Sequence, residues 1–359
     1  MSSRKFSECV SPGHPDKCAD YISEYILDRY LEKDPNTRYA VEVMIKGYNV
    51  YLAGEVTSTA QFTDYDYLQF VISALYEIGY TAEYFGKWGK GNVINPLLVK
   101  VVSHISAQSP EIGQGVDNEG FGDQGIFFGY ADPNGDEYMM PKSHSLAKNL
   151  CHMLYTQAKE KGIGGIDIKT EILLDERGNM EKIIAAVPCH GEEEYNLIYN
   201  SIRNWYNEKE VDLPFYPDII LNGTGNYVMH GPIADCGVTG RKLAVDFYGG
   251  ECKIGGGSVF SKDGTKSDVS LNLYARELAV KYATEEKQPV MVSLACCIGK
   301  NTIDYTVDNP CGENISTGTL SITPKELINK YDLNKPIFTS ICNFGLFGEF
   351  QKDKRWENL

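Results

Sequence analysis

The chain has 359 residues, of which 42% are hydrophobic and 23% charged, so it is long enough to bury a substantial core and to form two or three domains. Its 34 basic and 49 acidic residues give a formal net charge of −15, which excludes a protein that binds nucleic acid or an anionic membrane through a general basic field. Any anionic ligand must therefore meet locally concentrated positive charge.

The first residues, MSSRKFSECVSPGHPDK, are polar, and no apolar run approaches the roughly 18 residues needed to cross a bilayer. We therefore expect a cytoplasmic protein. The ten cysteines are scattered and include no C-x-x-C pair, so we expect reduced thiols, mostly in the core. Cys296 and Cys297 lie in the apolar run VMVSLACCIG and are expected to be small hydrophobic residues rather than redox groups.

The first periodic segment predicts a helix over about 17–33, because Ile22, Ile26 and Tyr30 share one face and an Asp-Pro-Asn breaker follows. The alternating segments RYAVEVMIK and NVYLAGEVT come next and predict a β-hairpin. Apolar spacing over 68–78 then predicts a second amphipathic helix. The unit is helix, hairpin, helix.

The same order returns twice, as helix 144–160, hairpin 166–187 and helix 193–207, and as helix 268–286, strands 289–308 and helix 323–331. The first helices of the three units start about a third of the chain apart. Alternating strands predict mixed or antiparallel sheets with one helix-covered face, whose other face needs a partner such as a second subunit. We therefore expect an α+β fold of three similar αβ domains, at 3–104, 115–229 and 231–352.

The segment Ser11-Pro12-Gly13-His14-Pro15-Asp16-Lys17 is a rigid turn that opens the first predicted helix. A helix start presents unpaired N–H groups and a partial positive charge, so His14 and Lys17 suit an oligophosphate there, and Asp16 offers an oxygen ligand for Mg²⁺. The alternative is a plain helix start with an exposed His and Asp. A co-chaperone His-Pro-Asp loop is excluded, because only thirteen residues precede His14, too few for the long helix that such a loop must follow.

The segment GFGDQG at 120–125 fits the G-x-G-x-x-G pattern, but no strand precedes it and the strand-like IFFGYA follows it, so a dinucleotide fingerprint is rejected. No P-loop motif occurs either. The stretch 95–120 begins as strand-like VKVVSHIS and continues as the glycine-rich tail QSPEIGQGVDNEG. This tail is either an active-site lid or a plain surface loop.

The densest polar region is 231–270, which holds nine glycines and balances five basic residues against five acidic ones. Clustered cations, backbone-exposing glycines and interleaved carboxylates suit a polyphosphate that carries Mg²⁺. The basic residues are Arg241, Lys242, Lys253, Lys262 and Lys266. A solvated glycine-rich loop is the alternative.

With GHPDKCAD, GFGDQG and GPIADCGVTGRK…YGG…GGG…KDGTKSD in this order, nearly the whole chain resembles the S-adenosylmethionine synthetase (methionine adenosyltransferase) family. The resemblance implies three similar αβ domains around a pseudo-threefold axis, in agreement with the repeat found from periodicity. It also implies a homodimer with shared active sites, or a homotetramer. The implied substrates are ATP and L-methionine, and the implied cofactors are two Mg²⁺ ions per site and K⁺.

Carried over block by block, the resemblance implies cation sites at three carboxylates: Asp16 and Asp268 for Mg²⁺, and Glu42 for K⁺. Glu55 in GEVTS and Gln108 in QSPEI match positions that hold the amino and carboxylate ends of methionine.

The resemblance implies a second set of residues for ATP. Asp123 and Lys169 match residues near the adenosine and phosphates, and Asp235 matches one that both substrates share. Tyr227 stands where a phenylalanine commonly stacks on adenine, a change that preserves stacking. The implied catalytic residues are His14, Lys17, Asp235, Arg241, Lys242, Lys262 and Lys266, of which Lys266 also lies near methionine.

Several positions depart from the family pattern. His230 replaces a usual glycine, Phe121 an alanine, Glu111 an aspartate and Val269 a common arginine. Residues 258–261, SVFS, replace a small-Phe-Ser-Gly run. These changes leave the expected carboxylates and lysines in place but alter the loop around the triphosphate.

The implied reaction is attack by the methionine sulfur on ATP C5′, followed by hydrolysis of the released tripolyphosphate to phosphate and pyrophosphate. Because a thioether carries no proton, the first step needs no general base. Catalysis must then come from in-line positioning and from stabilising charge on the leaving group. The alternative is an ATP-binding regulatory protein with the same fold and no chemistry, which could spare several of these residues.

Overall fold

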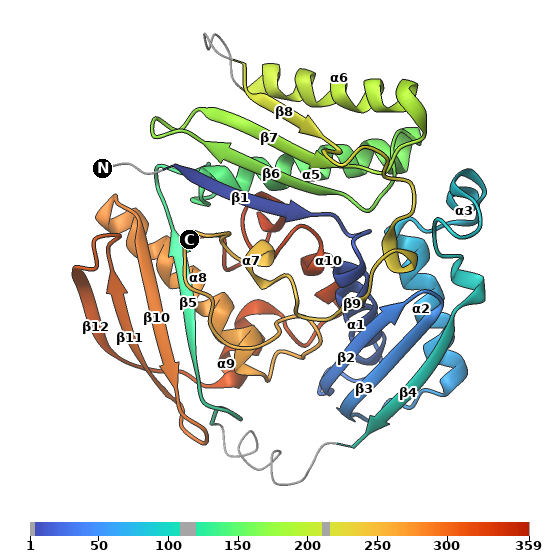
Figure 1. The fold of residues 1–359 in the computed structure, drawn as a ribbon. Coiled ribbons are helices and arrows are strands. Elements are labelled where there is room, and N and C mark those ends of the chain that lie inside the picture. The colour runs from blue at the N-terminus through green and yellow to red at the C-terminus, as the bar shows by residue number, and fades with distance from the viewer. Residues whose placement is uncertain (1–3, 108–119, 210–215, 359) are drawn as a thin grey trace.

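The computed structural model of the chain describes residues 4–107, 120–209 and 216–358. It contains three four-stranded sheets (Figure 1). The sheets surround a central group of helices that includes α1 (Pro15–Leu31), α7 (Leu243–Asp246) and α10 (Phe338–Cys342). The predicted α+β class is confirmed.

The first sheet is built on the predicted hairpin of β2 (Arg38–Lys46) and β3 (Asn49–Thr57). Strand β4 (Lys100–Ser106) runs parallel to β3, and the two-residue β9 (Gly237–Val238) pairs antiparallel with β2. Alternate side chains of β2 are buried on the side of α1, which packs on α2 (Asp64–Ile78), and the intervening ones lie on the open face.

The second sheet has the order β1-β6-β7-β8 and is antiparallel except between β7 and β8. Helix α5 packs on β1 and β6 of this sheet and also contacts α6. The bounds are β1 Lys5–Val10, α5 Lys142–Lys161, β6 Lys169–Leu174, β7 Met180–Ala186, α6 Gly191–Lys209 and β8 Asp218–Leu221.

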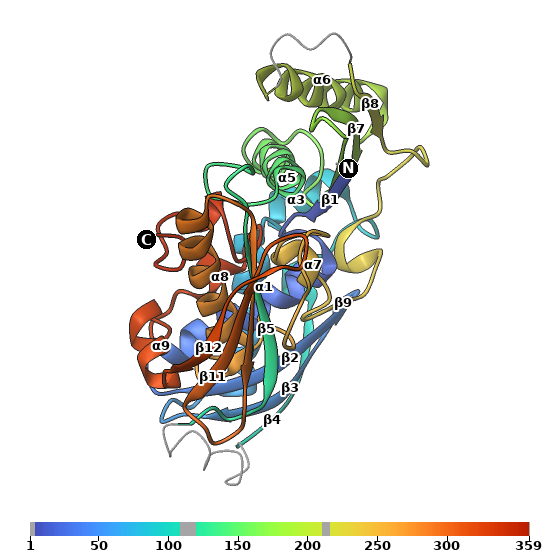
Figure 2. The ribbon, with the colours of Figure 1, turned by 90° about the vertical axis from the view of Figure 1, so that its left-hand side faces the viewer.

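The third sheet has the order β12-β11-β10-β5 and is wholly antiparallel. Helix α8 packs on β5 and β10 and contacts α9, and Figure 2 shows both helices on the same side of the sheet. The bounds are β5 Gly125–Ala131, α8 Ser267–Glu286, β10 Val290–Cys296, β11 Thr302–Asp308, β12 Asn314–Ser321 and α9 Pro324–Tyr331.

Each predicted hairpin and helix is present within a few residues, so the order helix, hairpin, helix occurs three times. Helix α1 begins two residues before its predicted start, because Pro15 occupies the first turn and the His14 side chain caps it. A short helix, α3 (Ala82–Trp88), was not predicted.

Strand pairing crosses the expected domain limits. Strand β1 precedes α1 in the chain but pairs with β6, and β5 falls within 115–229 but pairs with β10. Strand β9 falls within 231–352 but pairs with β2. The limits themselves stay a prediction.

Helix α1 carries four buried carboxylates one turn apart, Asp16, Asp20, Glu24 and Asp28, which we call the α1 carboxylate stripe. Each accepts a backbone N–H from a residue distant in the chain. The donors are, in the same order, Val238, Gly240, Ser261 and Phe338. The stripe therefore ties the glycine-rich region 231–270 to one face of one helix.

All ten cysteines are free. Cys296 is buried in β10 as expected, whereas Cys297 is exposed just beyond the strand, so the expectation of a core position is wrong for Cys297. None of the helices within the described ranges combines the length and apolar character of a membrane span.

Candidate functional site

A cavity of about 440 Å³ lies beside the start of α1, within the usual size range of small-molecule sites. Four residues predicted to contact ATP line it: His14, Lys169, Tyr227 and Asp235. They come from the capping turn of α1, the first residue of β6 and the segment between β8 and β9. The fold thus brings together residues that are far apart in the sequence.

His14 is held as a neutral imidazole. Its Nδ1 accepts the backbone N–H of Asp16 at 3.1 Å, which assigns the ring proton to Nε2. Burial, and after it the charges of Lys242 and Lys169, lower the pKa of His14 to about 3. His14 can therefore donate one hydrogen bond to a phosphate oxygen without contributing a positive charge.

Asp16 faces the cations of the glycine-rich region. Its carboxylate accepts a bond from Lys242 Nζ at 2.6 Å and from the N–H of Val238 at 3.0 Å, and Arg241 Nε lies 3.5 Å away. Burial acts to raise the pKa of Asp16, but the bonds from Lys242 and Val238 outweigh it and lower that pKa. The carboxylate is therefore ionised.

Lys17 does not face the cavity, contrary to the expectation from sequence. Its ammonium is buried between Asp246 at 2.6 Å and Asp20 at 3.0 Å, with the ring of Phe260 4.2 Å away. Burial alone would lower the pKa of Lys17, but the two carboxylates reverse this and raise it. Lys17 is a buried cation that joins α1 to α7.

The remaining predicted phosphate residues lie around the start of α8. Lys262 Nζ lies 2.7 Å from Asp268 Oδ2, and the N–H of Gly257 donates to Asp268 Oδ1 at 2.7 Å. A Cβ added at Gly256, whose φ is +77°, would meet Asp268 Oδ1 at 2.7 Å, so this close approach requires glycine. Lys266 pairs with Asp263 at 3.4 Å.

Glu42 connects the two halves of the site. Its carboxylate accepts the hydroxyl protons of Thr239, next to β9, and of Ser261, next to Lys262, the latter at 3.0 Å. Both loops flank β2, because Val41 N–H also donates to the Ser261 carbonyl at 3.0 Å. Asp16 is thus bonded to His14 and Val238, and Glu42 is bonded to Thr239, which follows Val238, and to Ser261, which precedes Lys262.

Two predicted residues, Glu55 and Asp123, are not joined to this group. Glu55 is exposed on the open face of the first sheet, and Asp123 lies before β5, where its side chain accepts only the N–H of Gln124. No side-chain contact among the described residues connects either one to the cavity. Gln108, the departure Glu111 and the proposed lid tail of 108–119 lie outside the described residues.

Asp167, which was not predicted from the sequence, also lines the cavity, two residues before Lys169. Its Oδ2 accepts the N–H of Gly231 at 2.7 Å, and its buried Oδ1 has no hydrogen-bond partner among the described residues. Burial raises the pKa of Asp167 from 3.8 to about 6. A half-satisfied buried carboxyl facing a cavity is suited to a ligand donor, but DIKT contains no motif that distinguishes it.

Three of the departures from the family pattern, Phe121, His230 and Val269, are buried packing residues. Val269 and Phe121 are fully buried. The ring of His230 is also buried, with its centroid 4.6 Å from that of Trp88 and its Nδ1 2.6 Å from the carbonyl of Val228. The Tyr227 hydroxyl donates to the Asp167 carbonyl at 3.1 Å.

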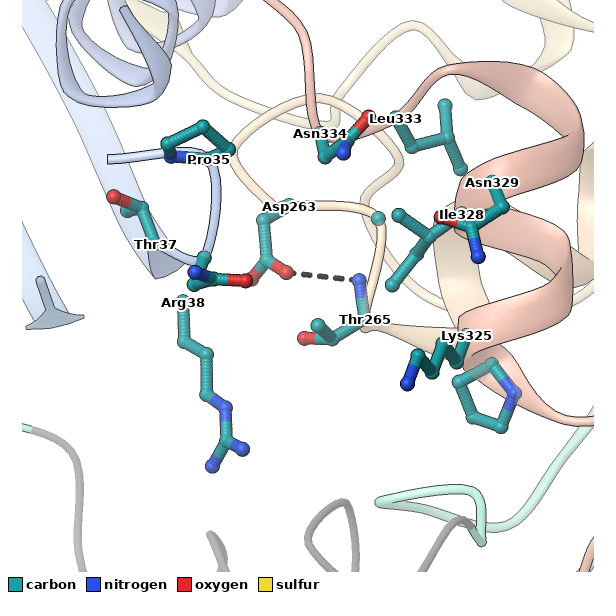
Figure 3. Close-up of a pocket in the computed structure, with 13 residues that line it drawn as sticks. Pro35, Thr37, Arg38, Asp263, Thr265, Lys325, Ile328, Asn329, Leu333 and Asn334 are labelled. Atoms are coloured by element: carbon teal, nitrogen blue, oxygen red, sulfur yellow. Dashed lines mark hydrogen bonds between the residues drawn. The ribbon is translucent and has the colours of Figure 1, made fainter. Parts of the chain in front are cut away.

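A second cavity of about 360 Å³ lies between β2, α9 and the loop that holds Asp263 (Figure 3). No predicted site residue lines it. The carboxylate of Asp263 accepts the N–H groups of Tyr39 at 2.7 Å and Thr265 at 2.8 Å. Asp263 therefore pins the loop between Lys262 and Lys266 to the start of β2.

Comparisons with known proteins agree over the whole chain. Residues 3–110 match the family model described as S-adenosylmethionine synthetase, N-terminal domain, and residues 229–358 match the model of its C-terminal domain. A curated S-adenosylmethionine synthase from Mycoplasmopsis synoviae is 33% identical over 98% of this chain and 94% of its own length, and one from Brachyspira hyodysenteriae is 31% identical with the same coverage. A solved structure from Campylobacter jejuni, described as an unusual S-adenosylmethionine synthetase, is 34% identical with a TM-score of 0.89, over 99% of this chain and 97% of that chain.

The raised pKa of Asp167 predicts a pH-dependent cost to folding. The folded protein keeps this proton up to about pH 6, whereas an unfolded Asp releases it near 3.8, so stability falls as the pH rises between these values. In Asp167→Asn, the free energy of unfolding should fall less over this range than in the parent, by on the order of 2–3 kcal/mol. Urea unfolding at several pH values measures it, and parallel pH profiles for the two proteins would contradict it.

Proposed function

The chain belongs to the S-adenosylmethionine synthetase family, and we propose that it makes S-adenosylmethionine from ATP and L-methionine. One observation carries the proposal. The two carboxylates expected to hold Mg²⁺ are each paired with a lysine expected to hold phosphate, Asp16 with Lys242 at 2.6 Å and Asp268 with Lys262 at 2.7 Å. A triphosphate that arrives with Mg²⁺ can replace both pairs at once, since each lysine gains a phosphate and each carboxylate gains a cation.

The residues fit the expected cations. Mg²⁺ in nucleotide sites is usually held by one or two carboxylates together with phosphate oxygens and water. Among the described residues no group of three or more His, Cys, Asp or Glu side chains could enclose a metal, which suits an ion held partly by the substrate. Bound Mg²⁺ would supply positive charge to the departing phosphates. Glu42 and the hydroxyls of Thr239 and Ser261 offer the oxygen atoms that K⁺ requires.

The proposed chemistry places the adenosine in the 440 Å³ cavity, against the ring of Tyr227 and beside Asp167 and Asp235. The methionine sulfur attacks C5′, the C5′–O bond breaks, and the electron pair leaves with the triphosphate. No proton moves in this step. Neutral His14 donates Nε2–H to a phosphate oxygen, and the cations of the loops stabilise the leaving group and then hold the tripolyphosphate for hydrolysis. These cations are Arg241, Lys242, Lys262 and Lys266, with Lys169 at the cavity.

Glu55 and Asp123 are separated from the cavity of their own copy, which supports a homodimer with shared sites. A homotetramer would be a larger assembly of such dimers. In this proposal the open sheet faces meet, and each copy lends Glu55, Asp123 and Gln108 to the cavity of the other. These faces expose large apolar side chains, which favours burial against a second copy. The side chains are Met44, Tyr51, Val102 and Ile126, exposed by 40%, 40%, 41% and 57%.

The direct test incubates the purified chain with ATP, L-methionine, Mg²⁺ and K⁺ and follows the products by mass spectrometry. A sulfonium product together with phosphate and pyrophosphate is expected. The alternative, an ATP-binding regulatory protein without chemistry, predicts that ATP binds and persists unchanged.

We predict that His14→Ala and Lys262→Ala slow sulfonium formation about a hundredfold while leaving the KM for methionine near the parent value, because both residues act on the leaving group. Single-turnover kinetics with saturating ATP separate the two effects. An unchanged rate with a raised methionine KM would mean that the two residues belong to the methionine subsite.

Mixing two inactive variants tests the shared site. His14→Ala and Glu55→Ala should each be nearly inactive, because each removes a group from every site. If the two residues come from different copies, a mixed dimer has one site with both defects and one intact site. An equimolar mixture that has exchanged subunits should then recover about a quarter of parent activity. No recovery, with exchange verified by native mass spectrometry, would place both residues in one copy.

A further inference from the structure

Ser261 has a backbone conformation that residues with a side chain rarely adopt. Its φ is +99°, in the region that favours glycine. The residue is fully buried and directly precedes Lys262, whose ammonium reaches Asp268 at 2.7 Å. The backbone at Ser261 therefore sets the direction from which Lys262 leaves the loop.

Every polar atom of Ser261 is bound. Its N–H donates to Oε1 of Glu24, its carbonyl accepts the N–H of Val41 at 3.0 Å, and its hydroxyl donates to Glu42 at 3.0 Å. A strained backbone conformation can persist in a folded protein when several contacts hold it in place, as these three hydrogen bonds do.

Among the described residues, Glu24 accepts one hydrogen bond, from the N–H of Ser261. It lies in the middle of α1 and is fully buried, and its Oε2 has no hydrogen-bond partner among the described residues. No ion pair of the described residues includes Glu24, in contrast to Asp16 and Asp20 of the same stripe. A buried carboxyl with half of its oxygen atoms unsatisfied is costly to the fold, so a role beyond stability explains its presence better.

We propose that Glu24 is a positioning residue, which holds Ser261 in its left-handed conformation and so directs Lys262 toward the triphosphate. The inference rests on the proposed function insofar as Lys262 contacts phosphate. Glu24 would then contribute to substrate binding without touching the substrate.

The chain offers a matched control in Asp28, one turn further along α1. Asp28 is also buried, and it also accepts backbone N–H groups, those of Phe338 and Thr339 at 2.9 Å each. These partners belong to α10 and not to the loop of Lys262. Loss of either carboxyl should lower the melting temperature, but only loss of Glu24 should alter the binding of a triphosphate.

The experiment measures the dissociation constant of the non-hydrolysable analogue AMP-PNP, with Mg²⁺, by equilibrium titration of the full chain. Glu24→Ala should weaken binding about tenfold, because Ser261 then relaxes toward an ordinary φ and carries Lys262 with it. Glu24→Gln keeps an acceptor oxygen and should stay within about twofold of the parent. The double variant Glu24→Ala with Ser261→Gly should bind AMP-PNP more tightly than Glu24→Ala alone, since glycine adopts this φ without strain, although it lacks the hydroxyl that bonds Glu42.

Asp28→Ala should lower the melting temperature and leave the AMP-PNP dissociation constant unchanged. The proposal fails if Glu24→Ala and the double variant bind AMP-PNP equally weakly, or if Asp28→Ala weakens binding as much as Glu24→Ala does. Because the titration needs no turnover, a chain that binds AMP-PNP but makes no sulfonium product would overturn the proposed function and leave this inference standing.

Discussion

The arrangement of the site depends on the α1 carboxylate stripe. Region 231–270 is rich in glycine, so its backbone has little intrinsic preference for one conformation. A helix is rigid, and successive stripe residues lie about 6 Å apart along its axis. Because Val238, Gly240 and Ser261 each donate an N–H to the stripe, the helix fixes the spacing of the loops that carry the cations. Hydrogen bonds to charged or buried carboxyl groups are among the stronger ones, so the loops gain order without apolar packing of their own.

The same region reconciles a strongly acidic chain with an anionic ligand. Three half-buried lysines of the loops each have a carboxylate partner, Lys242 with Asp16, Lys262 with Asp268 and Lys266 with Asp263. The positive charges of these three lysines are thus offset by nearby carboxylates. In the proposed function, exchange of these pairs, rather than a general positive field, would discriminate a triphosphate with Mg²⁺ from other anions.

Much of this structure could be predicted from periodicity, since the hairpins and long helices depend on local patterns that the sequence displays directly. The helix start at His14 was predictable for the same reason. The placement of Lys17 was not, because it depends on an ion pair with Asp246, a residue distant in the chain. Asp167 was missed because its role depends on burial, and the pairing of β1, β5 and β9 was missed because it joins segments that are distant in the chain. No side-chain contact among the described residues joins Glu55 or Asp123 to the cavity, so their roles rest on the proposed homodimer.

The exchange of strands between the three sheets has a consequence for how the protein is made. During synthesis β1 emerges first, but its partner β6 begins only at Lys169, and β2 lacks its neighbour β9 until Gly237 has left the ribosome. Strand β5 likewise lacks its partner β10 until the chain has been synthesised beyond Val290. No sheet can form all of its inter-strand hydrogen bonds early in translation. The nascent chain therefore carries unpaired strand edges until most of it has been translated. Chaperone protection of these edges during translation is therefore expected to matter more here than in a protein whose domains finish one after another.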